Sequence, residues 1–227
     1  MNPDKTLICG IINGLGDRFI SYASGMRLSK KLGRRFILWW PKTEHCMAGF
    51  YDLFEPIDGL EVSGESFETL AADKETCCCK LKCEVLTRVP RELPAGCFDL
   101  PQDAKTLLVA TTVNVILPDE MKSFSKNKTS IESEIKEWLR TLRPKDEIAR
   151  KISAFSMASF DKNTISIHLR RTDLDYWYKG VFQEDEKVVG VLKKYACNYP
   201  DARFFLACDS METTAAIVNA LGDKIIT

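Results

Sequence analysis

The chain has 227 residues, of which 45% are hydrophobic and 28% are charged. These fractions are close to ordinary globular usage, which disfavours a disordered, collagen-like or fibrous coiled-coil chain. The 32 Lys and Arg residues balance the 32 Asp and Glu residues, so the formal net charge is +0. A neutral chain has no global field that attracts nucleic acid or an anionic membrane, and an anion site must therefore be a local cluster of basic residues.

The compartment is predicted from apolar runs and cysteines. No apolar run approaches the ~20 residues that span a bilayer, and the polar first five residues do not resemble a secretory signal. The nine cysteines are odd in number, which favours reduced thiols over a disulfide framework. Within the cluster Cys77, Cys78, Cys79 and Cys83 only the last two have the spacing of a zinc-ligand pair, so we expect loop or half-buried thiols. The sequence thus predicts a cytoplasmic protein without a bound metal.

The first forty residues predict a strand, a helix and a second strand. Thr6–Ile12 is an apolar run of strand length, and Gly33 ends a helix whose apolar face is formed by Phe19, Tyr22, Ala23 and Met26. Residues 35–40 form the second strand. Because a helix connects them, the two strands are expected to be parallel.

The middle of the chain is less regular. Short strands are expected at 60–62 and 81–86, and a longer one at Leu107–Val115. The polar stretch 122–128 has the character of a linker. Thr129 and Glu132 then form a capping box that begins a helix, which Pro144 ends.

After Pro144 strands and helices alternate again. Helices are expected around 148–155, 188–195 and 217–221, and strands at Thr164–Leu169, Phe204–Cys208 and Lys224–Thr227. This order predicts a parallel, doubly wound sheet, and its three strands indicate that the second unit is incomplete. We therefore predict two α/β domains, residues 1–143 and 144–227, with a cleft between them.

The segment Ile165–Asp173 carries the strongest chemical signal. Strand alternation places Ser166, His168 and Arg170 on one face, and Arg170 to Asp173 follow at the carboxyl end of the strand, where open parallel sheets bind ligands. Two adjacent guanidinium groups there match the oxygens of a phosphate. The alternative is an Arg–Asp salt bridge beside a histidine packed in the core, and the residues alone leave both readings open.

The second candidate is the turn Gly14-Leu15-Gly16-Asp17-Arg18 between the first strand and helix. Glycines there let backbone amides approach a ligand at the helix N-terminus. The spacing is neither that of a dinucleotide-binding G-x-G-x-x-G motif nor that of a P-loop. A tight turn alone explains the glycines, whereas Asp17 and Arg18, held at the carboxyl edge of the sheet, favour a ligand site.

Together, the turn Gly14–Arg18 with Trp39-Trp40 and the segment His168-Leu169-Arg170-Arg171-Thr172-Asp173 resemble the GDP-fucose-dependent fucosyltransferases. This superfamily includes α-1,6-fucosyltransferases, the rhizobial nodulation fucosyltransferase and, more distantly, protein O-fucosyltransferases. The resemblance implies a GT-B architecture of two Rossmann-like units that face a cleft. It also implies a glycosyltransferase that moves fucose from GDP-fucose to a glycan or another hydroxyl acceptor, with inversion and without a metal.

The resemblance assigns roles to individual residues. Arg170 would hold the donor diphosphate, with Arg171 beside it, and neutralise the charge that develops on the leaving group. The donor site would be completed by His168, Asp173, Asp209, Ser210, Gly14, Gly16 and Arg18. Asp17 is a candidate base for the acceptor hydroxyl. Besides GDP-fucose as donor substrate, no cofactor is expected.

The family continues into a serine-rich third motif that this sequence does not contain before Thr227. The chain therefore resembles a truncated member or a soluble fragment of a Golgi-type enzyme. Two alternatives stay open: a catalytically silent module that binds a GDP-sugar or a glycan, and an NAD(P)-binding oxidoreductase, which the glycine spacing disfavours. The expected partners are a nucleotide sugar and a glycan acceptor, and not nucleic acid.

Overall fold

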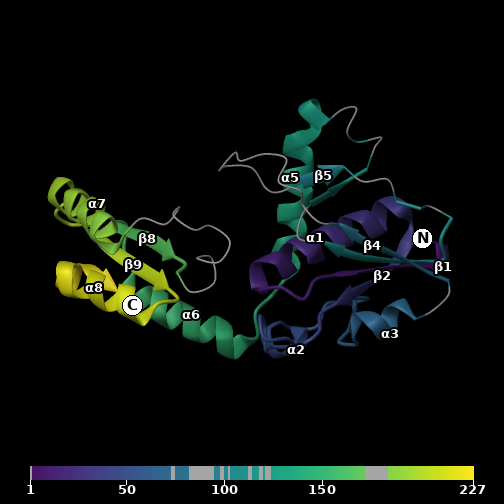
Figure 1. Ribbon diagram of the computed structural model, residues 1–227, viewed down its shortest axis with the longest axis horizontal. Helices are drawn as coiled ribbons and strands as arrows, with labels where there is room; N and C mark the ends of the chain where they lie inside the picture. The colour runs from purple at the N-terminus through teal and green to yellow at the C-terminus, as the bar shows by residue number, and fades with distance from the viewer. Residues whose placement is uncertain are drawn as a thin grey trace. The chain divides into compact units, whose positions relative to one another are not determined.

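The computed structural model describes residues 2–72, 75–81, 95–97, 100–101, 103–111, 114–117, 120, 124–171 and 184–227. The chain divides into two compact units, Met1–Ile148 and Ala149–Thr227 (Figure 1). Each contains a parallel sheet with flanking helices. This mixed α/β class with two Rossmann-like units is the one that the sequence predicts. Most of the strand expected at 81–86 lies outside the described residues.

The first unit is built on a five-stranded parallel sheet with the order β3-β2-β1-β6-β4. Its strands are β1 (Asn2–Gly10), β2 (Arg34–Trp39), β3 (Glu61–Ser63), β4 (Thr76–Leu81) and β6 (Thr106–Thr111). In the centre of the sheet, residues 7–10 of β1 and 107–110 of β6 read as continuous apolar runs because helices cover both faces of the sheet.

Helix α1 (Leu15–Leu32) covers one face of this sheet. Leu7 and Cys9 of β1 point into the core that includes Tyr22 and Leu28 of α1. The neighbouring Ile8 points to the opposite face, where α3 (Phe67–Ala71) packs. This alternation is the period-two pattern of a strand. As predicted, α1 ends at Gly33, which adopts a left-handed conformation with φ 64°.

Four further elements of the described residues belong to the first unit. Helix α2 (Phe50–Leu53) follows β2, and β5 (Ala95–Cys97) pairs with β7 (Asn114–Ile116) in a separate two-stranded sheet. Helix α5 (Phe124–Thr141) packs on α1 through Ala23, Ile131 and Ile135.

Two sequence expectations about this region are wrong. The single strand expected at Leu107–Val115 is divided between β6 and β7, which belong to different sheets. Helix α5 begins at Phe124, so most of the expected linker is helical and Thr129 is not its N-cap. The physical reason is that no Gly or Pro interrupts residues 124–141, so the helix propagates upstream once it has formed.

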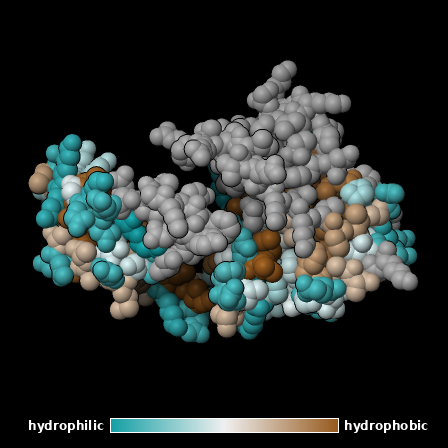
Figure 2. Space-filling model, viewed as in Figure 1, coloured by the Kyte–Doolittle hydropathy of each residue, from teal (hydrophilic) through white to brown (hydrophobic). Residues whose placement is uncertain are grey.

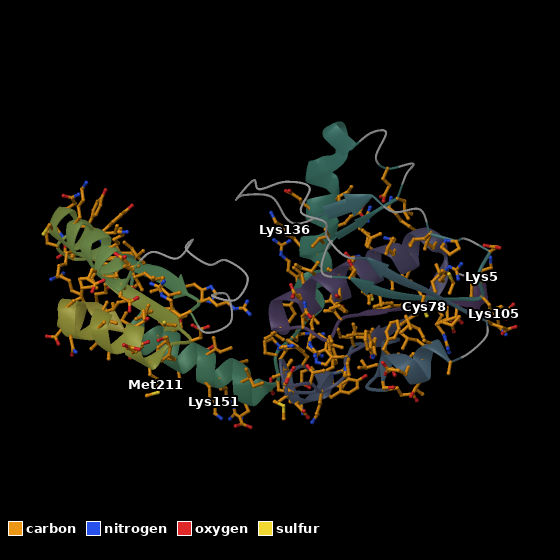
Figure 3. All side chains as sticks on the ribbon, in the orientation of Figure 1. Lys5, Cys78, Lys105, Lys136, Lys151 and Met211 are labelled. Atoms are coloured by element: carbon orange, nitrogen blue, oxygen red, sulfur yellow. The ribbon has the colours of Figure 1, made fainter. Side chains whose placement is uncertain are left out.

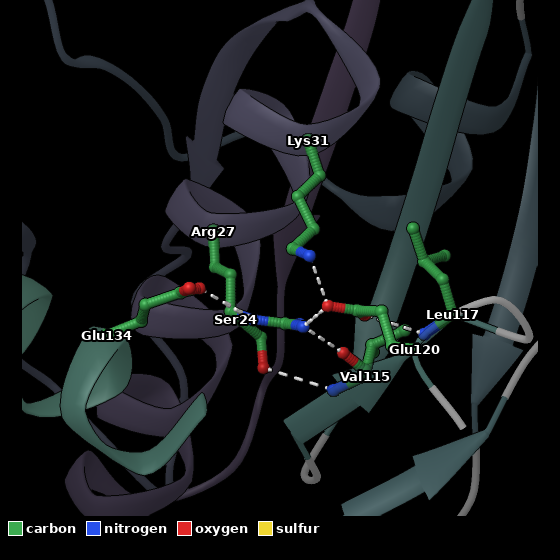
Figure 4. A network of polar contacts seen from close by, with 7 residues as sticks. All are labelled: Ser24, Arg27, Lys31, Val115, Leu117, Glu120 and Glu134. Carbon is green, nitrogen blue, oxygen red and sulfur yellow. Dashed lines mark hydrogen bonds and ion pairs between the residues drawn. The ribbon is translucent and has the colours of Figure 1, made fainter. Parts of the chain in front are cut away.

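A buried polar network fastens α1 to the segment around β7 (Figure 4). Arg27 donates to the Val115 carbonyl at 2.7 Å and pairs with Glu120, which is also paired with Lys31. The second oxygen of Glu120 accepts the Leu117 N–H at 2.9 Å. Arg27 of α1 thus satisfies the Val115 carbonyl, and Glu120, which two basic residues of α1 hold, satisfies the Leu117 N–H.

The second unit has a three-stranded parallel sheet with the order β10-β9-β8. Its elements are α6 (Asp146–Ser159), which begins in the first unit, β8 (Thr164–Leu169), α7 (Asp185–Asn198), β9 (Arg203–Cys208), α8 (Met211–Leu221), the 3₁₀ turn η1 (Gly222–Lys224) and β10 (Ile225–Ile226). Helices α7 and α8 cover one face through Leu192 and Ile217, which pack against Phe204 and Leu206. On the opposite face Phe160 contacts Phe205, with ring centroids 5.0 Å apart.

The surface of the second unit follows its amphipathic helices. Hydrophilic residues cover most of α7 in the space-filling view (Figure 2). Met211, the first residue of α8, is 91% exposed and its side chain points away from the unit (Figure 3). Among the helices of the described residues, none is both long enough and apolar enough to cross a bilayer.

Candidate functional site

The arginine pair lies where the sequence predicts it. Strand β8 has the expected bounds, and Arg170 and Arg171 follow it at the carboxyl end of the sheet. Arg170 is exposed, whereas the side chain of Arg171 is only 16% exposed. Asp173, the third charged residue of the motif, lies outside the described residues.

Two aspartates hold Arg171. Asp209 lies just after β9, and its Oδ1 accepts the backbone N–H of Arg171 at 2.6 Å. Asp185 lies at the start of α7, and its Oδ1 accepts the guanidinium Nη2 of Arg171 at 2.8 Å. The other oxygen of Asp185 accepts the Thr213 hydroxyl at 2.9 Å. The ends of two neighbouring strands and the first turns of two helices therefore meet at this one arginine.

Ser210, predicted beside Asp209, has a defined structural role. Its side-chain oxygen accepts the Thr213 N–H at 3.2 Å and caps α8. This bond satisfies one of the backbone donors that a helix N-terminus leaves unpaired. The structure thus brings Arg171, Asp209 and Ser210 together at the carboxyl edge of the second sheet.

The structure bears on both features of the alternative reading of the β8 segment, the histidine in the core and the Arg–Asp salt bridge. His168 is exposed, so it is not a histidine packed in the core. Arg171 does form a salt bridge, but with Asp185, which sequence reasoning missed. One sequence signal could have identified Asp185: it is an acidic residue in the first turn of the next helix, where its negative charge interacts favourably with the helix dipole.

The glycine turn of the first unit lies at the N-terminus of α1. Gly14 has φ −64° and ψ 172°, and none of the residues 14–18 of this turn has a positive φ. A Cβ built on Gly16 would meet nothing within 4 Å, and one on Gly14 would meet only the His45 carbonyl oxygen at 4.0 Å. The demands of a tight turn therefore do not explain these glycines, and the open space above them suits the approach of a ligand.

Arg18 is buried in this loop and is 1% exposed. Its guanidinium donates to the carbonyl oxygens of Asn13 at 2.7 Å, Pro41 at 2.7 Å and Ile12 at 3.2 Å, and it stacks over the Trp40 ring at 5.2 Å. Burial lowers its pKa below the ordinary value of arginine, but a guanidinium stays charged. Through these contacts Arg18 joins the loop after β1 to the segment after β2. The contact of Arg18 with a donor substrate stays a prediction.

Asp17 lies in the first turn of α1, next to Arg18. Its Oδ2 accepts the Asn13 side-chain amide at 2.8 Å. This bond orients the carboxylate at the positive end of the helix dipole. Whether it serves as a base stays a prediction.

Six cysteines are free thiols: Cys9, Cys46, Cys77, Cys78, Cys197 and Cys208. Cys77 and Cys78 lie on strand β4 and not in a loop, and Cys77 is half-buried, as the second of the two expected forms has it. Cys78 is exposed and is labelled in Figure 3. Burial raises the pKa of Cys9 to about 12, which keeps this thiol protonated. The part of the chain that the structure describes contains no group of three or more His, Cys, Asp or Glu residues placed to hold a metal ion.

The fold resembles solved fucosyltransferases. The structure of fucosyltransferase NodZ from Bradyrhizobium matches 99% of this chain and 79% of its own, with a TM-score of 0.59 at 16% identity. The structure of NodZ alpha-1,6-fucosyltransferase soaked with GDP-fucose matches 98% of this chain and 77% of its own, with a TM-score of 0.56 at 17% sequence identity. The structure of POFUT1 in complex with GDP-fucose matches 99% of this chain and 84% of its own, with a TM-score of 0.55 at 14% sequence identity.

No protein-family model matches the sequence, and no curated protein does. At these low identities the structural likeness establishes the fold. The prediction of a cleft between the two units stays a prediction. The chain thus has the GT-B-like fold of GDP-fucose fucosyltransferases, which the motifs at Gly14 and His168 had predicted.

Proposed function

We propose that this chain is a glycosyltransferase that transfers fucose from GDP-fucose to a hydroxyl group of a glycan or another acceptor. The observation that supports it is the arginine pair at the carboxyl end of β8, in which Asp209 and Asp185 hold Arg171, in a fold that solved fucosyltransferases share. In open α/β sheets this edge is the ligand-binding edge.

The chemistry requires a cation at the leaving group. Cleavage of the anomeric bond leaves negative charge on the diphosphate, and Arg170 is the exposed guanidinium that would neutralise it. At ~4 Å and an effective dielectric constant of ~20, one guanidinium attracts a unit charge by roughly 4 kcal/mol. Only the increase of this attraction as the bond breaks accelerates the reaction.

The finer points of the proposal concern the acceptor side and the donor pocket. Asp17 would accept the proton of the acceptor hydroxyl, which attacks the anomeric carbon with inversion. His168, Asp173 and Asp209 would shape the nucleotide pocket, and Gly14 and Gly16 would let backbone amides at the N-terminus of α1 approach the donor. No metal or other cofactor is needed in this scheme.

One experiment tests the proposal. Calorimetric titration with GDP, GDP-fucose, UDP and NAD should show binding of the two guanosine ligands, and GDP release from GDP-fucose in the presence of glycan acceptors should continue after addition of a chelator. GDP binding without turnover would indicate the silent binding module instead. Binding of NAD without GDP would indicate the oxidoreductase and overturn the proposal.

A further inference from the structure

Asp185 is the residue through which three elements of the second unit meet. It is the first residue of α7, and its carboxylate is shared between Arg171 after β8 and Thr213 in the first turn of α8. The Asp185 side chain is 31% exposed and Thr213 is buried. Neither residue belongs to the motifs that the sequence analysis selected.

The two ends of Arg171 are fixed independently. Asp209 fixes its backbone N–H and Asp185 fixes its guanidinium, so the main chain and the side chain are both oriented by charge-assisted hydrogen bonds, which are stronger than neutral ones. Arg170 is the preceding residue and shares a peptide unit with Arg171. Fixing Arg171 therefore also restricts the direction in which the exposed Arg170 leaves the strand.

We propose that Asp185 is a positioning residue, which orders Arg171 and thereby the arginine pair for a nucleoside diphosphate. This inference rests on the proposed function, because GDP is the ligand whose binding it concerns. Asp185 does not itself need to touch the ligand. Thr213 has a supporting role, since its hydroxyl fixes the second carboxylate oxygen of Asp185.

A simple charge argument makes the opposite prediction. Asp185 carries the same sign as a diphosphate, so its removal should strengthen anion binding if it acted only through space. A positioning role predicts weaker GDP binding when Asp185 is removed. The Arg171 guanidinium would then no longer be ordered in advance, and the entropy cost of ordering it would reduce the free energy of binding. The sign of the change in GDP affinity therefore separates the two accounts.

The test compares GDP titrations of the full chain and four variants. Asp185→Asn keeps the shape and removes the charge, and we expect it to weaken GDP binding about 10-fold. Thr213→Val should weaken binding about 3-fold, and Thr213→Ser, which keeps the hydroxyl, should restore it. Glu186→Gln is the matched control, because it removes the same charge at the next, exposed position of α7.

The outcomes are distinguishable. Wild-type chain that does not bind GDP would overturn the proposed function and this inference with it. Wild-type binding with unchanged or tighter binding by Asp185→Asn would overturn the inference alone. Melting temperatures of all variants are measured in parallel, and equal loss of affinity in Thr213→Ser and Thr213→Val would also contradict the role of the hydroxyl.

Discussion

Arg170 is the single residue on which the proposed chemistry depends most. Arg170→Ala should weaken GDP binding by roughly 2–4 kcal/mol, or ~30-fold to ~1000-fold, because a charge-assisted contact with the diphosphate is lost. Arg170→Lys should recover only part, since an ammonium keeps the charge but not the planar fork. The measurement is GDP affinity by calorimetry, with the melting temperature recorded for each variant.

Arg203→Ala provides the control for Arg170. It removes the same charge from the same unit, but Arg203 lies at the opposite, amino-terminal end of β9. Its GDP affinity should stay close to that of the wild type. An Arg170→Ala variant with wild-type GDP affinity would contradict the assignment of Arg170 as a diphosphate ligand.

Arg18 is expected to act on stability first. Arg18→Ala would leave several loop carbonyls without their donor and empty a buried volume, so the free energy of unfolding should fall by about 2–4 kcal/mol. Exposed Arg35, paired with Glu61 at 3.6 Å, is the control, and Arg35→Ala should cost less than about 1 kcal/mol. Urea unfolding gives both values, and unchanged stability with lost GDP affinity in Arg18→Ala would instead make it a ligand contact.

At the scale of elements, the contact between α1 and β2 has little tolerance. A Cβ added to Gly25 of α1 would lie 2.4 Å from Phe36 Cε2 and 2.9 Å from Cys9 Cβ. Gly25→Ala should therefore lower the free energy of unfolding by about 1–3 kcal/mol through overpacking. In α7, a Cβ built on Gly190 meets nothing within 4 Å. Gly190→Ala should therefore raise the free energy of unfolding by about 0.5–1 kcal/mol, because alanine loses less backbone entropy in a helix. Changes of the same sign in the two variants would refute this account.

The attachment of α1 to the segment around β7 should depend on pH. Burial alone would raise the pKa of Glu120, but the Leu117 N–H, Lys31 and Arg27 outweigh it and hold this pKa below the ordinary value of a glutamate. A carboxyl whose pKa is lower in the folded state contributes stability above its unfolded pKa of about 4.5, and loses it as the pH falls through the folded value. We expect acid to weaken the fold in that range.

Substitution isolates this contribution. Glu120→Gln should lower the free energy of unfolding at pH 7 by about 2–4 kcal/mol, because buried Arg27 loses the buried one of its two charge partners. It should also flatten the loss of stability below pH 4.5. Glu134→Gln, at a half-exposed partner of Arg27, should cost less. Equal effects in the two variants, measured by urea unfolding across pH, would contradict the assignment.

At the scale of the whole molecule, two separate hydrophobic cores predict two unfolding transitions. The core of the first unit and that of the second share no residue. Because a ligand stabilises only the state that binds it, GDP at ~100 times its Kd should add ~2.7 kcal/mol to the unit that contains Arg170. Scanning calorimetry with and without GDP measures this, and a single transition that shifts as a whole would contradict it.

The sequence determined the local elements well, because helix and strand periodicity is written into neighbouring residues. It predicted the bounds of β8, the helix end at Gly33 and the placement of Arg170 and Arg171 at the carboxyl end of a parallel strand. It was wrong where a run rich in Leu, Val and Thr, residues 107–115, concealed a change of sheet between β6 and β7. It was also wrong where Thr129 and Glu132 mimicked a cap inside α5.

Only the tertiary structure decided which residues serve each other. Arg18 donates to the carbonyl of Pro41 across 23 residues, Arg171 donates to Asp209 across 38, and Arg27 reaches Glu120 across 93. Such pairs depend on the order of strands in the sheet and on which helix face is buried, and neither is encoded in a local pattern. The sequence thus identified the arginines of the site by their type and position, while the fold decided that Arg18 binds the loop and that Asp185 holds Arg171.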